Sequence, residues 1–476
     1  MLLKRNLLVA VGLATVAVVA LRAAPQVPAP DARIDAIFAQ WTEATPGCAV
    51  GVGRSGEPVL ERAYGMADLE HDVRNTPATV FEGGSVAKQF TAAAVLLLVR
   101  DGKVSLDDPI RRYFPELPAV TAPVTVRHML NHTSGLRDWG NLAGIAGWPR
   151  GTRVHTHAHV LEIISRQRAI NFPPGSHYSY SNSGYNLAAM LVARVSGLPF
   201  AEFTRQRIFQ PLGMTRTSWR DDYTRVVKGR AIAYAADGAA FRQDMPFENV
   251  HGNGGLLTTV GDLLRWNENF VTPVVGDTSF VALQQTTAPF TTRTMQTYAF
   301  GLMLGSYKGV REVSHSGSTA GYRAFLTRFP DQHLSVAVLC NAGSANPTAA
   351  AHAVADVYLA GRLNPAAPAP AAPAETQGPL ARLTGDDTFR PTGAALAQYA
   401  GAYANAEVET TLVVAVKGGE LVARRRTDTI ALRPHSPDRF DGGSLGIVTF
   451  HRANGRVAAL GITQDRVWDL RFARER

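Results

Sequence analysis

A proline- and alanine-rich stretch divides this 476-residue chain into two parts with different hydrophobic patterns. The stretch reads LNPAAPAPAAPAE over residues 363–375, a composition typical of a semi-rigid linker. Before it, helical patterns alternate with strand-like runs, whereas after about residue 393 short alternating runs are separated by turn signals such as Gly-Gly and Asn-Gly. We predict an α/β domain over 32–362, a linker over 363–392, and a small antiparallel β-domain, barrel or sandwich, over 393–476.

The first residues have the pattern of a secretory signal. Lys4 and Arg5 precede an uncharged apolar run from Leu7 to Leu21. Because a membrane-spanning helix usually needs about 20 apolar residues, we predict a signal peptide over 1–24 and an exported protein, periplasmic or secreted. The cleavage site is poorly marked, so an uncleaved N-terminal anchor that associates the protein with a membrane stays open.

Strand patterns lie at both ends of the α/β domain. Two strands are expected around the turn Ser55–Pro58, and four more fill residues 297–341. Helices are expected over 85–99 and 184–195, among others. This order predicts one α/β unit whose sheet is completed by both ends of the segment.

Ser85 and Lys88 stand three positions apart at the start of an apolar helical run, SVAKQFTAAAVLLL. Residues three apart on a helix share a face, so the two side chains can meet. A serine hydroxyl becomes a good nucleophile when a neighbouring base accepts its proton, and lysine can be that base when burial lowers its pKa. The pair therefore predicts a nucleophile and its base, although an exposed helix start has the same four-residue pattern in many chains.

Tyr180 and Asn182 lie in the segment GSHYSYSNSGYNLA. In extended backbone, residues two apart point to the same side, so the phenol and the carboxamide can reach one cavity. The tyrosine can pass on a proton, and the amide can bind a substrate carbonyl or orient Lys88. A core tyrosine beside a helix-capping asparagine is the alternative interpretation.

A third motif, His315-Ser316-Gly317-Ser318, is expected on an edge strand. Glycine at this place lets the backbone approach a ligand closely. The N–H groups of Ser318 and Ser85 can then form a two-donor oxyanion hole for an acyl-transfer intermediate.

Taken in order, Ser-x-x-Lys, Tyr-x-Asn and His-x-Gly resemble the motifs of the class C β-lactamase-like family of penicillin-recognising serine hydrolases. The strings FEGGSVAKQFTAAAVLLL, VTVRHMLNHTSGL and GNGGLLTTVGDLLRW are similar as well, and the resemblance covers about residues 32–360. It implies a β-lactamase/transpeptidase-like α/β fold, with an antiparallel sheet flanked by helices and a helical subdomain. The C-terminal region resembles the lipocalin-like β-domain attached to some members.

The resemblance also implies roles for single residues. Ser85 is expected to be the nucleophile, with Lys88 and Tyr180 as its base system. The residues expected to bind substrate are Asn182, His315, Gly317 and Ser318. His132 is expected to hold a loop near the site. The resemblance implies no cofactor and no metal, and it implies a small molecule or a peptide as substrate.

One motif departs from the family's β-lactamases, which carry Lys-Thr-Gly where this chain has His315-Ser316-Gly317. A histidine is mostly neutral at pH 7 unless its neighbours favour the charged form. His315 therefore attracts a substrate carboxylate less than a lysine would, unless Arg323 replaces the missing cation. The same substitution is familiar among DD-peptidases, D-aminopeptidases and esterases of the wider family. We therefore predict a hydrolase that cleaves an ester or amide through acyl-Ser85, of esterase or D-amino-acid peptidase type. A β-lactamase, or a penicillin-binding sensor that turns over slowly, is the alternative.

Two further motifs are weaker. Gly442–Gly446 matches Gly-x-Ser-x-Gly, but a strand-like run follows where a nucleophile elbow needs a helix, so a β-turn is predicted. His155, His157 and His159 alternate around Thr156, the expected N-cap of a helix, and residues two apart on a helix diverge. The pattern argues against a metal site.

The net charge of +9 includes one dense basic run, Arg424 to Arg426, in strand-like sequence. A solvated strand face is commoner than a nucleic-acid site for such a run, and no nucleic-acid partner is expected. The oligomeric state is left open.

Cys48 and Cys340 are the only cysteines, which excludes a disulfide-rich scaffold. The family's sheet sets the first strand beside the last one, which makes the two cysteines neighbours. A disulfide and two buried free thiols both remain open.

Overall fold

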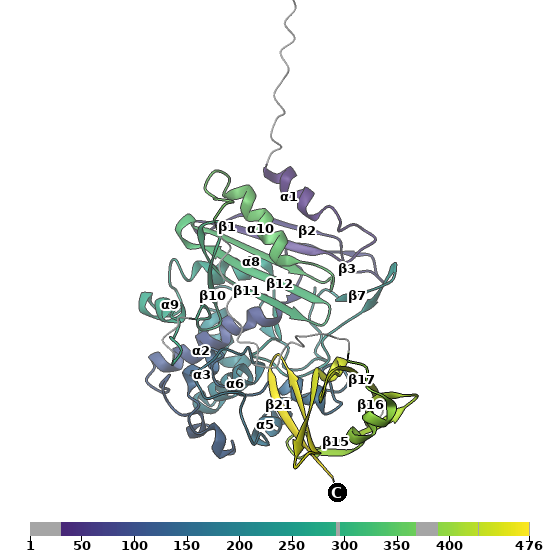
Figure 1. Ribbon diagram of the computed structural model, residues 1–476. Coiled ribbons are helices and arrows are strands. Elements are labelled where there is room, and N and C mark those ends of the chain that lie inside the picture. Colours follow the sequence, from purple (N-terminus) through teal and green to yellow (C-terminus); the bar gives the residue numbers. More distant parts are fainter. Residues whose placement is uncertain (1–29, 292–295, 368–388, 427, 476) are drawn as a thin grey trace, which may run out of the picture.

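The computed structural model describes residues 30–291, 296–367, 389–426 and 428–475. Figure 1 shows an α/β unit built on an antiparallel sheet and, beside it, a closed barrel formed by the C-terminal residues. The strand order of the sheet is β10-β11-β12-β13-β1-β2, so both ends of the α/β segment complete it, as predicted. The bounds of its strands are β1 Cys48–Arg54, β2 Glu57–Tyr64, β10 Met303–Tyr307, β11 Val310–Thr319, β12 Tyr322–Phe329 and β13 Leu334–Cys340.

Helices cover both faces of this sheet, and the residues of β1 show why helices can pack on each face. Val50 is buried on the face that carries α1 (Pro30–Phe38) and α10 (Pro347–Tyr358). On the opposite face, Gly51 lets α8 (Val260–Glu268) come close, since an added Cβ would lie 3.1 Å from an α8 side chain. The alternation along one strand therefore separates a valine-rich core from a face of small residues.

The helical subdomain packs around α2 (Lys88–Arg100), which is buried from its first residue to Leu98. A helix that is apolar on all sides must be enclosed by other elements. The other helices of this domain that have not yet been given are α3 Val126–Leu130, α4 Trp139–Ile145, α5 His157–Ser165, α6 Asn182–Ser196, α7 Phe200–Thr204 and α9 Thr278–Gln284. Its short helical turns are η1 Gly84–Ala87, η2 Ile110–Arg112, η3 Ala119–Thr121, η4 Arg205–Phe209 and η5 Pro330–Gln332. Its short strands are β3 Met66–Asp68, β4 Val73–Arg74, β5 Phe81–Glu82, β6 Ser218–Trp219, β7 Tyr234–Asp237, β8 Ala240–Gln243 and β9 Leu256–Thr258.

The C-terminal domain is an eight-stranded antiparallel barrel, the first of the two predicted alternatives and consistent with a lipocalin-like domain. Pairing of the first strand with the last closes it, so no sheet edge is left open. Its strands are β14 Gly401–Asn405, β15 Thr410–Lys417, β16 Glu420–Arg425, β17 Asp428–Ser436, β18 Arg439–Asp441, β19 Ile447–Ala453, β20 Arg456–Gln464 and β21 Val467–Arg474, accompanied by α11 Gly393–Leu396, η6 Ala397–Tyr399 and η7 Gly443–Leu445. The turn η7 is followed by β19 and not by a helix, so the Gly-x-Ser-x-Gly match is a turn, as predicted.

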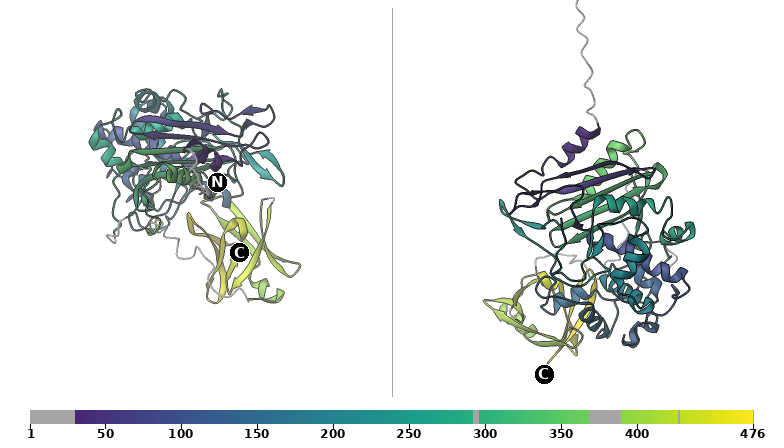
Figure 2. Two further views of the ribbon diagram at one scale, coloured as in Figure 1. Left: turned by 90° about the horizontal axis from the view of Figure 1, so that it is seen from above. Right: turned by 180° about the vertical axis from the view of Figure 1, so that it is seen from behind.

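The barrel packs against the helical subdomain, as Figures 1 and 2 show from three sides. Leu142 and Ile145 of α4 belong to the same hydrophobic core as the inward-facing barrel residues. Nearby, Arg137 and Glu407 form a buried ion pair of 2.8 Å between the two domains. The shared apolar core and the buried ion pair hold the two domains in one arrangement.

Two arginines of the basic run, Arg425 at the end of β16 and Arg426 after it, are part of this interface. Arg425 is buried and donates hydrogen bonds to the carbonyl oxygens of Gly144 and Ile145, while Arg426 donates to that of Ala146 at 2.9 Å. These carbonyls lie at the C-terminal end of α4, where a helix has no partners of its own for them. The expectation of a solvated basic face is therefore wrong for Arg425.

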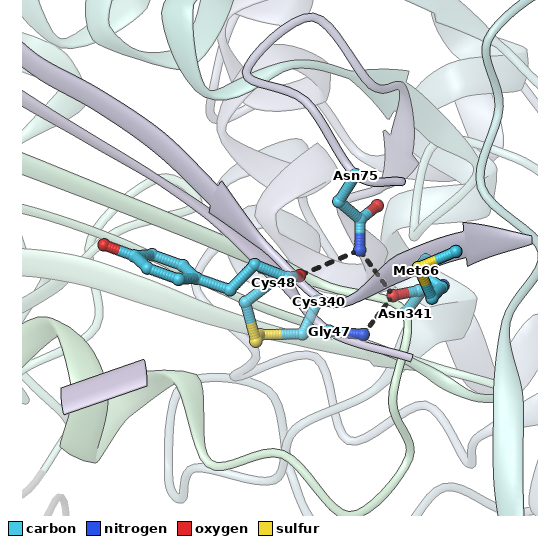
Figure 3. Close-up of a disulfide and its surroundings, with 7 residues drawn as sticks. Gly47, Cys48, Met66, Asn75, Cys340 and Asn341 are labelled. Carbon is cyan, nitrogen blue, oxygen red and sulfur yellow. Dashed lines mark hydrogen bonds between the residues drawn. A yellow bond between two sulfur atoms is a disulfide. The ribbon is translucent and has the colours of Figure 1, made fainter. Parts of the chain in front are cut away.

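Cys48 and Cys340 lie opposite each other on β1 and β13 and form a disulfide with a Cα–Cα distance of 4.0 Å (Figure 3). The neighbouring side chain of Asn341 accepts a hydrogen bond from the N–H of Gly47 at 2.8 Å and donates one to the carbonyl oxygen of Met66 at 3.0 Å. The first and last strands of the domain are thus joined covalently and by a buried amide.

Two predicted segments fall outside the described residues: the signal or anchor over 1–24 and most of the linker over 363–392. Among the residues that are described, no single helix is long and apolar enough to cross a bilayer. Only α6 and the helical segment Phe200–Phe209 meet that test together, and they are bent by 81°.

Replacing both cysteines by alanine is expected to lower the free energy of unfolding by about 2–4 kcal/mol, because the bridge constrains a long loop of the unfolded chain. The bridged residues are 292 positions apart. Denaturant titration of wild type and of the Cys48→Ala/Cys340→Ala variant measures the difference. Two reactive thiols in unfolded wild-type protein kept free of reductant would contradict the disulfide.

Candidate active site

Ser85 lies in the turn η1, not within α2 as the sequence predicts. The expected single helix over 85–99 is a 3-10 turn followed by an α-helix that begins at Lys88. In a 3-10 turn, residues three apart are eclipsed, which brings the two side chains even closer than an α-helix does. The strand before the turn is held by Glu82, whose buried carboxylate accepts two hydrogen bonds from Arg220, at 2.9 and 3.1 Å.

Two glycines let this turn touch β11. Gly84 has φ of +50°, and a Cβ there would lie 2.5 Å from the backbone nitrogen of Ser318. A Cβ on Gly317 would lie 2.0 Å from the carbonyl oxygen of Gly83. Backbone this close admits no side chain at either position. The backbone segments that carry the N–H groups of Ser85 and Ser318 therefore lie against each other, as the predicted oxyanion hole requires.

The expectation that His315 lies on an edge strand needs correction, because β11 is flanked by β10 and β12. Pairing with β10, however, ends at Ser314. From His315 to Thr319 the strand is paired only with β12. The half of β11 that carries the motif therefore lies beyond the end of β10, on the side of the cleft.

Lys88 is fully buried at the base of the site. Its Nζ donates hydrogen bonds to Asn182 Oδ1 at 3.0 Å and to the carbonyl oxygen of Asn253 at 2.6 Å, and it lies 3.1 Å from Ser85 Oγ, whose hydroxyl can donate to the neutral amine. Burial, followed by the positive charge of Arg466, lowers the pKa of Lys88 well below its ordinary value. Loss of water disfavours the charged ammonium, so a neutral amine is available next to the serine hydroxyl.

Asn182 is placed by a residue that the sequence analysis did not single out. The carboxylate of Asp138 accepts a hydrogen bond from the N–H of Asn182 at 2.7 Å. This bond satisfies a donor that a helix start leaves unpaired, and α6 accordingly begins at Asn182, two residues before the predicted start of this helix at 184. The side chain of Asn182 is thereby directed at the amine of Lys88, consistent with the predicted role in orienting the lysine.

Tyr180 lies over the lysine, with 4.8 Å between Lys88 Nζ and the centre of its ring. The ring of His132 packs against that of Tyr180 at a centroid distance of 4.2 Å. His132 Nδ1 also accepts a hydrogen bond from the N–H of Ser181 at 3.1 Å. His132 therefore holds the segment that carries the tyrosine, in agreement with its expected structural role.

His315 is neutral in this site. Burial, and then the charge of Lys88, lower the pKa of His315 to about 3. Its Nδ1 lies 2.6 Å from the carbonyl oxygen of Ser316, which can only accept, so Nδ1 carries the proton. The other nitrogen, Nε2, then accepts from the hydroxyl of Tyr298 at 2.9 Å. The position where β-lactamases of the family carry a lysine thus has no cation here.

These residues surround one cleft of about 1100 Å³ between the sheet and the helical subdomain. The predicted site residues that line the cleft are Ser85, Tyr180, Asn182, His315, Gly317 and Ser318. Lys88 lies beneath Ser85, outside the lining. All seven predicted site residues are thus brought together from segments far apart in the sequence.

The structure adds residues that the sequence analysis did not assign. Asn253 lies in the quoted string GNGGLLTTVGDLLRW, yet nothing in the string says that its carbonyl oxygen would accept from the catalytic lysine. Arg150 and Arg466 also line the cleft. Arg466 belongs to the barrel, and no local pattern in the sequence connects it with this site.

The alternating histidines have separate partners. His157 Nε2 lies 2.9 Å from the carbonyl oxygen of His251, whereas the ring of His159 lies 3.3 Å from the backbone nitrogen of Thr156. His155 packs its ring against Trp139. Thr156 is the N-cap of α5, as predicted.

The family model described as Beta-lactamase matches residues 34–361. The chain belongs to the Beta-lactamase family. Among curated relatives of this family member, a D-aminopeptidase of Cereibacter sphaeroides is 29% identical over 333 residues, which are 69% of this chain and 62% of the relative. A D-aminopeptidase of Brucella anthropi is 32% identical over 62% of this chain and 56% of the relative. The chain therefore spans only about 60% of the length of these curated relatives.

Solved structures agree with the fold of this Beta-lactamase family member. The D-amino acid amidase of Ochrobactrum anthropi SV3, solved with L-phenylalanine amide, is 25% identical and has a TM-score of 0.60 over 69% of this chain and 97% of its own. An octameric penicillin-binding protein homologue from Pyrococcus abyssi is 24% identical, with a TM-score of 0.63 over 93% of this chain and 98% of its own. The second likeness shows the fold alone, and it extends over both domains.

Replacing Lys88 by alanine is expected to lower kcat/KM for a p-nitrophenyl ester about 10²–10⁴-fold, because the general base is lost. In the wild type only the neutral amine can accept a proton, so kcat/KM is expected to be constant above the pKa of Lys88 and to fall as pH drops below it. Since burial lowers that pKa well below 10.5, activity extends far into the range where an ordinary lysine is charged.

The pH profile also separates Lys88 from His315. A His315→Gln variant is expected to keep the acid limb at the wild-type position, because His315 is neutral throughout that range. Initial rates measured across pH for both proteins test this assignment. Disappearance of the limb in His315→Gln would assign it to the histidine and not to the lysine.

Proposed function

We propose that this protein is a serine hydrolase that cleaves an amide or ester bond of a D-amino-acid compound through an acyl-Ser85 intermediate. The observation that carries the proposal is the distance of 3.1 Å between Lys88 Nζ and Ser85 Oγ, at a lysine that is completely buried. A neutral amine at hydrogen-bond distance from a hydroxyl is the arrangement that general-base activation of serine needs.

In the acylation step, Ser85 Oγ attacks the substrate carbonyl carbon as its proton passes to Lys88 Nζ, directly or through the phenol of Tyr180. The negative charge that forms on the carbonyl oxygen is bound by the N–H groups of Ser85 and Ser318. The carbon–nitrogen or carbon–oxygen bond then breaks, and the leaving group takes the proton from the lysine. Attack by water on the acyl-serine, with the same base accepting its proton, releases the acid and restores the hydroxyl.

The D-amino-acid class is supported by the relatives named D-aminopeptidase and by the structural likeness to a D-amino acid amidase. The neutral His315 supports a hydrolase of this kind over a β-lactamase, because the cation that would hold the β-lactam carboxylate at this position is missing. A penicillin-binding sensor that is acylated and deacylates slowly is the remaining alternative from the sequence.

Hydrolysis of D-alanine p-nitroanilide is expected to exceed that of the L-enantiomer and of nitrocefin, and the Ser85→Ala variant is expected to lose on the order of 10⁶-fold in kcat. The assay compares the three substrates and a p-nitrophenyl ester on both proteins, with intact-mass analysis to detect the acyl-enzyme. Equal turnover by Ser85→Ala would refute the nucleophile. A burst equal to the enzyme concentration, without further turnover, would support the sensor instead.

We also propose that the protein is exported, on the basis of the signal-like segment over 1–24 and of the Cys48–Cys340 disulfide, a bond that persists in oxidising compartments. N-terminal sequencing of protein recovered from the periplasm or the medium tests this proposal. A mature protein that begins after residue 24 is the expected result, and a membrane-bound chain that begins at Met1 would favour the uncleaved anchor.

A further inference from the structure

Asp138 joins the first turns of two helices through its buried carboxylate. Its Oδ1 accepts hydrogen bonds from the N–H groups of Gly140 and Asn141 at the start of α4, at 2.9 and 3.2 Å. Its Oδ2 accepts from the N–H of Asn182 at the start of α6, at 2.7 Å. The positive ends of two helix dipoles therefore meet at one carboxylate, and such a place favours negative charge.

No lysine or arginine among the described residues forms an ion pair with Asp138. Arg137, its neighbour in the chain, pairs instead with Glu407 at 2.8 Å. Arg150 pairs with the buried carboxylate of Glu248. Burial of a charged group is unfavourable, and a neutral asparagine or serine caps a helix as well as aspartate does. Capping alone therefore does not account for a charged side chain at this position.

One residue separates this carboxylate from the catalytic amine. The backbone of Asn182 donates to Asp138, and the side-chain Oδ1 of the same asparagine accepts from Lys88 Nζ at 3.0 Å. The described lining of the cleft itself contains no aspartate or glutamate. Asp138 therefore holds the carboxylate that a chain of two hydrogen bonds connects to the amine.

Charged groups of both signs act on the Lys88 amine. Burial, followed by the charge of Arg466, lowers the pKa of Lys88. The charge of Asp138 raises this pKa, and that of Arg150 lowers it. The other titratable side chains that face the amine are Tyr180, Tyr185, His132 and His315. Asp138 is the one carboxylate in this set, and its charge favours the ammonium form of the lysine.

We infer that Asp138 is a positioning residue whose carboxylate stabilises the ammonium ion that forms when Lys88 accepts the proton of Ser85. This inference rests on the proposed function and deepens it by naming a further residue of the same site. As the bond from Oγ to the carbonyl carbon forms, the O–H bond breaks, the proton moves to Nζ and negative charge moves to the carbonyl oxygen. The positive charge arises in a buried place, where a carboxylate held behind Asn182 stabilises it without any rearrangement. When the leaving group takes the proton, the amine is neutral again.

The test follows the rate at which a fluorophosphonate probe labels Ser85 of the full chain across pH, because this reaction reports activation of the serine without a known substrate. Asp138→Asn removes the charge with little change of shape. The acid limb of the labelling rate is expected to move about one pH unit toward lower pH, because the pKa of Lys88 falls when a nearby negative charge is removed. The plateau rate is expected to fall at least about threefold, because a weaker base accepts the proton less readily.

Two further variants separate the charge of Asp138 from its shape. Asp138→Glu keeps the carboxylate and is expected to keep the acid limb at the wild-type position, even where its longer side chain lowers the plateau. Asp277→Asn is the matched control, since Asp277 is the N-cap of α9, accepts from the N–H of Phe280 at 2.9 Å and lies outside the cleft lining. This control is expected to leave both the limb and the plateau unchanged.

An acid limb that stays in place in Asp138→Asn, or moves to higher pH as it would if the variant only admitted water to the amine, would overturn the inference. Circular dichroism shows whether the variants are folded. Asp138→Ser, which removes the charge and keeps a capping hydroxyl for α4, decides if Asp138→Asn is not. Failure of the proposed function is recognised separately: Ser85 of the wild type would then not be labelled at any pH, whereas labelling with an unshifted limb refutes only the role of Asp138.

Discussion

The arrangement of the site depends on burial of the Lys88 amine away from water. Lys88 carries a group that is charged in water, yet it is fully buried at the start of a helix that is enclosed on all sides. Burial of an unpaired ammonium is costly, and a lowered pKa together with three oxygen partners, two of which can only accept, makes the position tolerable. The apolar flanks of α2, the helix start at Asn182 and the loop at Asn253 all serve this arrangement. The same loss of water that makes a buried ammonium costly also lowers the pKa of Lys88, and the neutral amine can then act as a base.

The barrel contributes a residue to the cleft and packs firmly on the catalytic domain. Helix α4 contributes to the barrel's hydrophobic core, and Arg425 binds carbonyls at the end of that helix. A buried ion pair between Arg137 and Glu407 adds a polar link across the interface. Docking of this kind delivers the turn with Arg466 to the cleft, so the electrostatics of a site in one domain are set partly by the other domain.

Much of this architecture was predictable from the chain. The three motifs, a sheet completed by both ends of the α/β segment and a small antiparallel β-domain follow from local spacing and periodicity, and the residues of the motifs meet in one cleft. The β-lactamase-like fold was implied by the resemblance, and the barrel was one of two alternatives that the periodicity left open. Element boundaries were less accurate. The helix at Ser85 is broken into a turn and a helix where Gly84 must approach Ser318, and α6 starts early because the distant Asp138 caps it. Contacts between remote segments decided both boundaries, and a local pattern contains no record of such contacts.

The sequence by itself determined which hydroxyl and which amine meet, because a spacing of three residues in a helical turn places the two side chains together. Their roles as nucleophile and base were implied by the resemblance that the three motifs carry together. The sequence also determined that His315 would not supply a reliable cation. Only the tertiary structure decided the charge of the cleft. Arg466 reaches Tyr180 through the docking of a barrel that follows in the chain long after the catalytic motifs, and periodicity does not encode how two domains pack. Local geometry thus brings the reacting side chains together, and long-range packing sets which charged residues line the cleft.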